Sequence, residues 1–370
     1  MGRNTRIWER PAMDRMIDRE GDELPGEKVF FENFEVNWAP FRPQPREFQG
    51  QIADDTIDRD TRRVESIKEK ISREQDLSRQ HESRLGKRLE YCFAEGFQSY
   101  DWLGDEVFVT PASEHDDIEN GIDLILAVET ENGEVMLMGV DVVSTKEPQV
   151  VDDKILRNVD GLNKGSLSQI RYFKSEDFPS LKPSQQMPRV VLGLETGSGM
   201  ALYEKFVKAA TGEIPKNSLA QGEMINQIRE EVVTQLGYYL ELTCRKFHEF
   251  ISRKAKLSPE DNKALAELGK LAGVVKNINK CSDQINTAPF RDLTNFLDQQ
   301  EEKLKKIDSH LAGNIFKHLE LYQYFSQLKK GLTDDSAAPD KNHPAKQDPV
   351  KDALVIADKG RLEARSYAQT

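Results

Sequence analysis

Residues 119–146 read ENGIDLILAVETENGEVMLMGVDVVSTK and contain two apolar runs rich in β-branched residues, 122–130 and 135–145. The turn-forming residues Asn132 and Gly133 lie between the runs, and this pattern predicts a β-hairpin. Nearly every position of both runs is apolar, which is typical of central strands that other elements cover on both faces. The sequence therefore predicts a hairpin at the centre of a sheet.

Two acidic residues, Asp123 and Asp141, interrupt this apolar pattern. A two-residue loop would place them on opposite faces, whereas a three-residue loop, residues 131–133 with Gly133 in the left-handed region, pairs them directly. The polar residues of both strands occupy odd-numbered positions, so matching polar with polar requires a loop of odd length. We therefore predict the three-residue loop and two facing carboxylates.

Two facing carboxylates in an apolar hairpin repel each other, and burial makes the charge of each one costly. A shared divalent cation is a common remedy. The alternative is structural: Asp123 caps the start of its strand, and Asp141 accepts hydrogen bonds from the backbone or from Thr145. Both interpretations stay open at the level of the sequence.

The whole chain has 370 residues, 37% of them hydrophobic, and a formal net charge of −12. This charge argues against a protein that coats nucleic acid through bulk electrostatics, although it allows a local basic groove. Three widely spaced cysteines, Cys92, Cys244 and Cys281, predict reduced thiols, not disulfides or a zinc site. The N-terminus has no signal-peptide pattern and no run is apolar enough to span a membrane, so we expect a cytoplasmic protein.

The N-terminal half predicts an arm followed by an α/β core. Residues 1–57 have no sustained periodicity and predict an extended or poorly ordered arm. A single long helix is expected over residues 58–97, with a highly charged first half and an apolar stripe in its second half. Strands are expected at 106–111, in the hairpin and at 189–195, and a helix interrupted by glycines is expected at 152–175. This order predicts an α/β fold over residues 58–199.

The C-terminal half predicts helices. Within residues 200–332 we expect one long helix from 219 to about 256, another that begins at Pro259 after the cap residue Ser258, and a final pair over 289–332. Their heptad-like spacing allows an intramolecular bundle or a coiled-coil dimer, and the aromatic-rich stripes favour the bundle. Residues 333–370 are expected to form a flexible tail.

This order of elements, with GKRLE at 86–90, GIDLIL at 121–126 and GVDVVSTK at 139–146, resembles the PD-(D/E)XK nuclease-like superfamily. The resemblance covers residues 86–195 and implies a restriction-endonuclease-like core, a mixed sheet flanked by helices. It also implies hydrolysis of phosphodiester bonds in DNA or RNA. Carried over by position, Glu90, Asp123 and Asp141 would bind Mg²⁺ or Mn²⁺.

The superfamily's lysine lies two residues after the second strand acid, where this chain has Val143. Lys146 is nearby, but it reaches the site only if a β-bulge turns it to the other face. The following helix offers three other donors: Lys154, Gln169 and Arg171. The resemblance also suggests a role for Gln169, because some branches carry a glutamine on this helix. Lys146 and Gln169 are therefore the predicted catalytic residues.

Two classes of function follow from these patterns. The three acids favour a metal-dependent nuclease, whereas the displaced lysine and the acidic charge favour a catalytically inactive scaffold. Such a scaffold would contact a protein partner, or a second copy of the chain, through its helices. A further candidate ligand, His115 in SEHDDIEN, is predicted to be a solvated loop residue.

Overall fold

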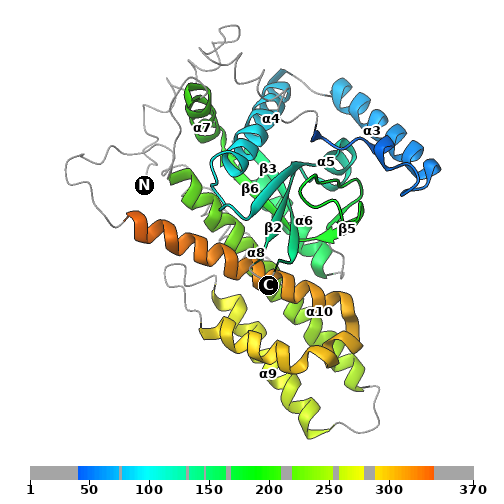
Figure 1. Cartoon of the computed structure of the whole chain (residues 1–370), viewed down its shortest axis with the longest axis vertical. Helices are drawn as coiled ribbons and strands as arrows, with labels where there is room; N and C mark the ends of the chain where they lie inside the picture. The colour runs from blue at the N-terminus through cyan, green and yellow to red at the C-terminus, as the bar shows by residue number, and fades with distance from the viewer. Residues whose placement is uncertain are drawn as a thin grey trace, which may run out of the picture.

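The computed structural model describes residues 41–74, 77–130, 133–145, 147–163, 168–209, 219–252, 258–278 and 288–336. A mixed four-stranded sheet with the strand order β1-β2-β3-β6 is flanked by helices, and long helices extend away from it (Figure 1). The predicted α/β class is therefore confirmed. Lys146, Cys281, and the predicted arm and tail over 1–40 and 337–370 lie outside the described residues.

The described elements follow one another along the chain with these bounds: η2 Pro45–Phe48, α3 Asp54–Glu74, α4 Leu77–Gln98, β1 Val107–Pro111, α5 Glu114–Asn120, β2 Leu124–Glu129, β3 Val135–Thr145, α6 Pro148–Asn163, β4 Ser168–Ile170, β5 Gln185–Met187, β6 Arg189–Glu195, α7 Thr196–Ala209, α8 Leu219–Ser252, α9 Pro259–Ile278 and α10 Ala288–Ser336. β2 is antiparallel to both of its neighbours, β1 and β3, and β3 is parallel to β6.

β2 and β3 form the predicted hairpin with the predicted register. The pairing runs from the turn to Leu124 opposite Val140. Gly133 has φ +74°, the left-handed conformation that the three-residue loop requires of it. The predicted register thus holds as far as Leu124; at the next residue the N–H of Asp123 donates to the carbonyl of Val140 at 2.8 Å, so the predicted direct pairing of Asp123 with Asp141 is not part of the described ladder.

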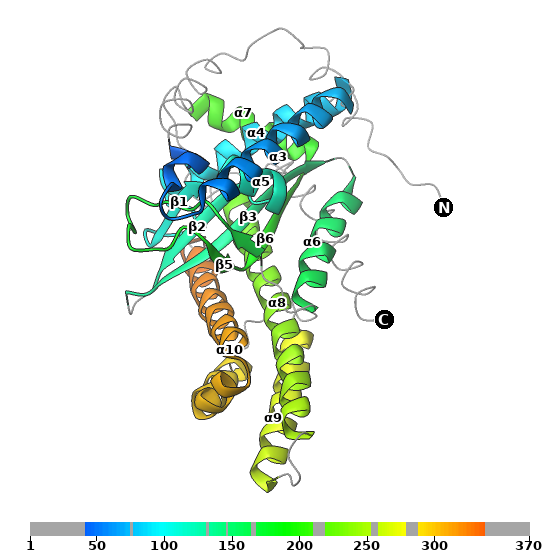
Figure 2. The ribbon, with the colours of Figure 1, turned by 90° about the vertical axis from the view of Figure 1, so that its right-hand side faces the viewer.

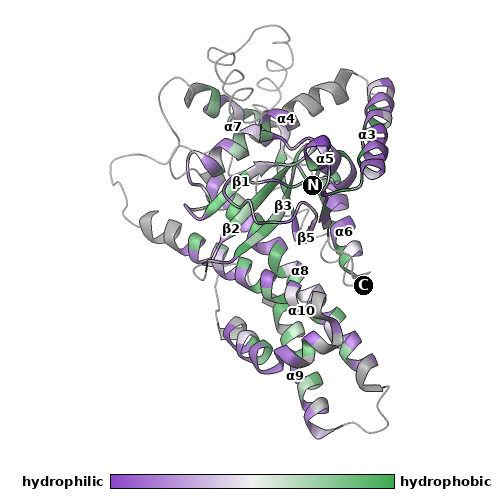
Figure 3. Cartoon of the chain, turned by 45° about the vertical axis from the view of Figure 1, so that its right-hand side comes forward, coloured by the Kyte–Doolittle hydropathy of each residue, from purple (hydrophilic) through white to green (hydrophobic). Residues whose placement is uncertain are grey.

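The two faces of the sheet are covered by different elements. The even-numbered side chains of β2 and β3 join the main hydrophobic core, which also contains buried side chains of α4, α7, α8, α9 and α10. On the opposite face Val143 packs with Val151 of α6 and Val191 of β6. Figures 2 and 3 show the apolar strands lying between α4 and α6. The hairpin is thus buried on both sides.

The free edge of β6 is covered by α8, not by another strand. Three α8 side chains, spaced four residues apart, bind its backbone: Gln227, Glu231 and Gln235. Glu231 Oε2, for example, accepts the N–H of Val191 at 2.9 Å. These bonds satisfy edge groups that would otherwise be open to pairing with another strand. Because α8 shares one core with the sheet, the predicted boundary at residue 200 separates no independent core.

Two predictions for the α/β part are wrong. The single helix over 58–97 is two helices, α3 and α4, and the hydrophilic α3 packs beside α5 at the edge of the molecule (Figure 3). The helix over 152–175 ends at Asn163, and Ser168–Ile170 forms the strand β4, paired with β5. Ile170 is buried and Gln169 is exposed, an alternation that three residues cannot distinguish from a helical pattern.

The C-terminal helices pack within one chain. α8 lies against α9 and α10, as expected for the intramolecular bundle, and α9 begins at the predicted Pro259. α10 is interrupted at Asp308, whose carboxylate pairs with Lys246 of α8, so it forms the predicted pair of helical segments. In Figure 1, α9 and the adjoining part of α10 project away from the sheet. None of the described helices is long and apolar enough to cross a membrane.

Candidate metal centre

Glu90 is positioned by the amphipathic pattern of α4. One face of this helix buries Leu89, Phe93 and Phe97 completely against the sheet. Glu90 lies at the border of this stripe, and its side chain is 13% exposed. The helix therefore holds the carboxylate at the rim of the core, where it is poorly solvated but accessible to a small ion.

A second carboxylate, Asp117, comes from α5, a helix that the sequence patterns did not predict. α5 begins at the N-cap Ser113, whose hydroxyl accepts the N–H of Asp116, and ends at Gly121, which is left-handed at φ +61°. Both are standard helix-end signals, so a search for caps would have found this seven-residue helix. Its carboxylates are the residues that the hairpin argument did not consider.

The third carboxylate belongs to Asp123, which directly precedes β2. Its Oδ2 accepts the N–H of Val142 at 2.7 Å, so the strand backbone fixes the orientation of the side chain. Carboxylate oxygens of Glu90, Asp117 and Asp123 lie within 4.8 Å of one another. Three hard oxygen ligands at this spacing suit Mg²⁺ or Mn²⁺. This group is called the acid cluster below.

One cation already contacts the acid cluster. The Lys87 ammonium donates to Glu90 Oε2 at 2.9 Å and to Asp117 Oδ2 at 2.8 Å. Arg42 adds a second contact to Asp117 at 3.2 Å. Lys87 lies in the GKRLE segment, one turn before Glu90, so the i,i+3 spacing was a signal that the sequence analysis missed.

Charge and burial in the acid cluster displace the pKa values of its members. Burial, followed by the charges of Glu90 and Asp117, raises the pKa of Asp123 well above its usual range. Burial also raises the pKa of Glu90 against the opposing effect of Lys87. The pKa of Asp117 is lowered: burial acts in the opposite direction, but Lys87 and Arg42 outweigh it. Full ionisation of the cluster therefore requires more positive charge than Lys87 supplies.

Asp141 lies beside the acid cluster but outside the group of three. Its side chain is 2% exposed, and its Oδ1 accepts a hydrogen bond from Lys154 of α6 at 2.5 Å. Burial raises the pKa of Asp141, and Lys154 partly offsets this effect. Asp141 is close enough to raise the pKa of Asp123 as well. The structure thus places Glu90 and Asp123 together with Asp117, whereas Asp141 forms a salt bridge with Lys154.

Of the two predicted catalytic residues, the structure describes Gln169 alone, and it does not bring Gln169 into this group. Lys146 lies outside the described residues. Gln169 is exposed on β4, where its Nε2 donates to Ser184 Oγ at 3.0 Å. Arg171, another candidate donor, forms a salt bridge with Asp60 of α3. Of the donors considered from the sequence, Lys154 is the one found beside a strand acid.

The expectation that His115 is a solvated loop residue is wrong. His115 lies in α5 and is 5% exposed, with Nε2 3.4 Å from Asp60 and its ring edge-on to Tyr172. Asp60 also accepts hydrogen bonds from Arg171 and Tyr172. These contacts fasten α3 to α5 and β4, which explains the burial of a histidine in an acidic segment.

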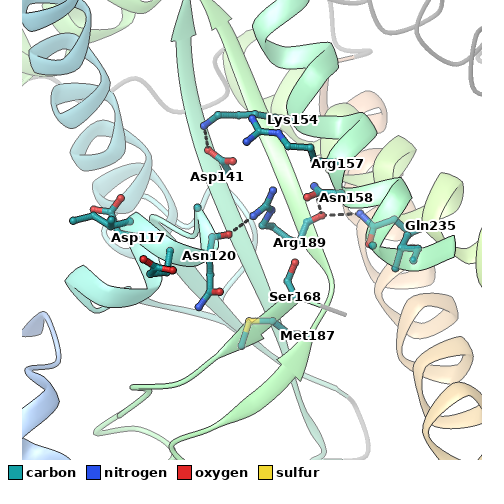
Figure 4. A pocket seen from close by; sticks show the side chains of 15 residues that line it. Asp117, Asn120, Asp141, Lys154, Arg157, Asn158, Ser168, Met187, Arg189 and Gln235 are labelled. Atoms are coloured by element: carbon teal, nitrogen blue, oxygen red, sulfur yellow. Dashed lines mark hydrogen bonds and ion pairs between the residues drawn. The ribbon is translucent and has the colours of Figure 1, made fainter. Parts of the chain in front are cut away.

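A cavity of about 510 Å³ opens next to Asp117 and Asp141. It is lined mainly by polar side chains from α5, α6, β6 and α8, including Lys154, Arg157 and Arg189 (Figure 4). Comparison of the chain with protein-family profiles, curated proteins and solved structures finds no match. The functional argument therefore rests on the geometry of the acid cluster and of this cavity.

Proposed function

We propose that this protein is a metal-dependent phosphodiesterase that acts on nucleic acid. The observation that carries the proposal is the acid cluster, in which three carboxylates lie within 4.8 Å of one another. Acids of this kind repel each other unless a cation binds between them. A divalent ion held there would polarise a phosphoryl oxygen and lower the pKa of a bound water.

The arrangement of the elements supports the same proposal. β1, β2 and β3 are antiparallel, β3 and β6 are parallel, and α4 and α6 pack on opposite faces. This is the mixed sheet flanked by helices expected of a restriction-endonuclease-like core. In such a core, acids from the first helix and from the hairpin are neighbours, as Glu90 and Asp123 are here.

We assign the role of the catalytic cation to Lys154. It reaches the buried Asp141 from α6, and its side chain is 26% exposed. A substrate phosphate placed between the acid cluster and Asp141 would lie next to this ammonium. A fixed positive charge at that position stabilises negative charge that develops in the transition state. Lys154 thus takes the role for which the sequence resemblance pointed to Lys146.

One observation favours the alternative function, a scaffold without catalysis. Lys87 already contacts two of the three cluster acids, so part of the charge is neutralised without a metal. If this neutralisation were sufficient, the cluster would be a structural ion-pair network. The protein would then act through partners of its helices, and its acids would contribute only to stability.

Cleavage assays distinguish the two functions. Labelled single-stranded and duplex DNA and RNA are incubated with wild type, Asp123→Asn and Lys154→Met, each with Mg²⁺, with Mn²⁺ and with EDTA. The matched control is Glu267→Gln, because Glu267 is exposed on α9, remote in sequence from the acid cluster. We expect metal-dependent cleavage by wild type and the control, and a loss of at least about 100-fold in both site variants. Equal activity of wild type and Asp123→Asn would contradict the proposal.

A further inference from the structure

The cavity beside Asp141 is lined by residues of α5, β3, α6, β4, β5, β6 and α8. The end of α5 contributes Asn120, α6 contributes Arg157 and Asn158, β6 contributes Arg189, and α8 contributes Gln235. Its volume of about 510 Å³ is within the range of about 300–1,000 Å³ that is usual for small-molecule sites. A cavity of this size accommodates a single nucleotide, and α6 and α8 form walls around it.

The acidic side chains of the cavity are neutralised. Each of the three acids that line it forms a salt bridge: Asp117 with Lys87, Glu119 with Arg63, and Asp141 with Lys154. Two of these cations, Lys87 and Arg63, lie outside the cavity lining. Lys87 also contacts Glu90, so this one cation is shared by two acids.

The two cavity arginines lie near acidic groups without being paired to them: the charges of Asp141, Glu231 and Asp123 act on Arg189. Among the described residues, no carboxylate forms a salt bridge with Arg157 or Arg189. Arg157 donates from Nε to the carbonyl of Asp153 in its own helix, which leaves the rest of its guanidinium available. Three acidic and three basic side chains line the cavity, and two of the basic ones, Arg157 and Arg189, carry guanidinium groups, which are well suited to bind phosphate.

Arg189 is held in place for such a role. Its guanidinium donates to the carbonyl of Asn120, and its own carbonyl accepts from Asn158 and from Gln235, the latter at 2.7 Å (Figure 4). Its Nε is buried and has no hydrogen-bond partner in the part of the chain that the structure describes. A buried donor without a partner is costly, and a ligand oxygen would satisfy it.

We propose that this cavity binds a phosphorylated terminal nucleotide, with its phosphate on Arg157 and Arg189. This inference rests on the proposed function, since it places the end of a nucleic-acid strand in the cavity and the adjoining phosphodiester at the acid cluster. The enzyme would then act on strand ends and release mononucleotides.

Binding is tested without metal, so that it is independent of catalysis. Calorimetric titration in EDTA compares a nucleoside 5′-monophosphate, a 3′-monophosphate, the unphosphorylated nucleoside and inorganic phosphate. We expect one of the two monophosphates to bind wild type. The affinities of the nucleoside and of inorganic phosphate should be lower by about tenfold or more. Arg157→Ala should weaken the monophosphate by about tenfold, the usual effect of losing one charge-assisted hydrogen bond. Arg245→Ala, the control at an exposed position of α8, should bind like wild type.

Two outcomes would overturn the inference: no monophosphate bound by wild type, or unchanged binding by Arg157→Ala. Equal affinity for inorganic phosphate and the monophosphates would also overturn it, because the cavity would then recognise no nucleotide. If monophosphates bind but no nucleic acid is cleaved, the inference stands and the proposed function fails. If cleavage occurs, circular single-stranded DNA should resist it, and cleavage of the circle as fast as of linear DNA would contradict action at strand ends.

Discussion

Lys154 of α6 donates a hydrogen bond to the buried Asp141 of β3, with Nζ and Oδ1 2.5 Å apart. The position two residues after Asp141 cannot supply this cation, because Val143 is buried against α6. A helix therefore provides the charge that the hairpin strand lacks. The two residues lie 13 positions apart in the sequence, one on β3 and the other on α6.

Removal of this lysine should destabilise the protein. Lys154→Met leaves a buried carboxylate without its cation, and we expect a loss of about 2 kcal/mol in the free energy of unfolding at pH 7. The double variant Lys154→Met/Asp141→Asn should recover most of this loss, since no buried charge remains. Urea unfolding of the four proteins in this mutant cycle measures the coupling, and additive effects would show that the two side chains do not interact.

Gly121 should tolerate no side chain. It is left-handed, and a Cβ atom there would lie 3.2 Å from Nη1 of Arg189 and 3.5 Å from Oδ2 of Asp141. Gly121→Ala is therefore expected to cost about 1–3 kcal/mol and to disturb the cavity. The control Gly269→Ala is in α9, where the added Cβ contacts nothing within 4 Å, and should raise stability by about 0.5–1 kcal/mol. If Gly121→Ala and Gly269→Ala unfolded at similar urea midpoints, a side chain at position 121 would not be excluded.

His318 should make stability depend on pH. It is fully buried between Asn314 and Gln235, and burial lowers its pKa from 6.5 to about 4. The folded state binds a proton on His318 less well than the unfolded state does. The stability contributed by the neutral His318 is therefore complete above pH 6.5 and is lost as the pH falls towards 4. The full effect is on the order of 3 kcal/mol.

The matching experiment measures the free energy of unfolding of wild type and His318→Gln between pH 4 and 7.5. The difference between the two proteins should shrink as the pH falls, because glutamine does not titrate. A difference that is constant across the whole range would mean that His318 does not titrate in this way.

The sequence could predict the parts of the fold that depend on local pattern. The odd-numbered polar positions and Gly133 determined the hairpin register, and the cap at Ser258 located the start of α9. The strand β4 could not be predicted, because Ser168–Ile170 is too short to show a period of its own. Its conformation depends on pairing with β5, which lies about 15 residues later and leaves no local signal.

The candidate site was predicted only in part, because local sequence pattern identifies only some of its residues. Glu90 and Asp123 were identified because each lies in a patterned element, a helix stripe and a strand start. Asp117 and Lys87 were missed, although Ser113 and Gly121 mark the ends of α5 and Lys87 is one turn from Glu90. The pairing of Lys154 with Asp141 is a tertiary contact between α6 and β3. Such a contact depends on how α6 packs on the sheet, where Val151 meets Val143, and leaves no local signal in the sequence.

Thermal unfolding with and without Mg²⁺ or Mn²⁺ tests the metal centre most directly. A metal that binds the folded state at 100 times its Kd stabilises it by about 2.7 kcal/mol. We predict a metal-dependent rise in Tm for wild type and for Glu267→Gln, and none for Asp123→Asn. In EDTA, Asp123→Asn should be at least as stable as wild type, because burial already raises the pKa of Asp123 and disfavours its charge. An equal metal-dependent rise in all three proteins, or none in wild type, would contradict a metal centre at Glu90, Asp117 and Asp123.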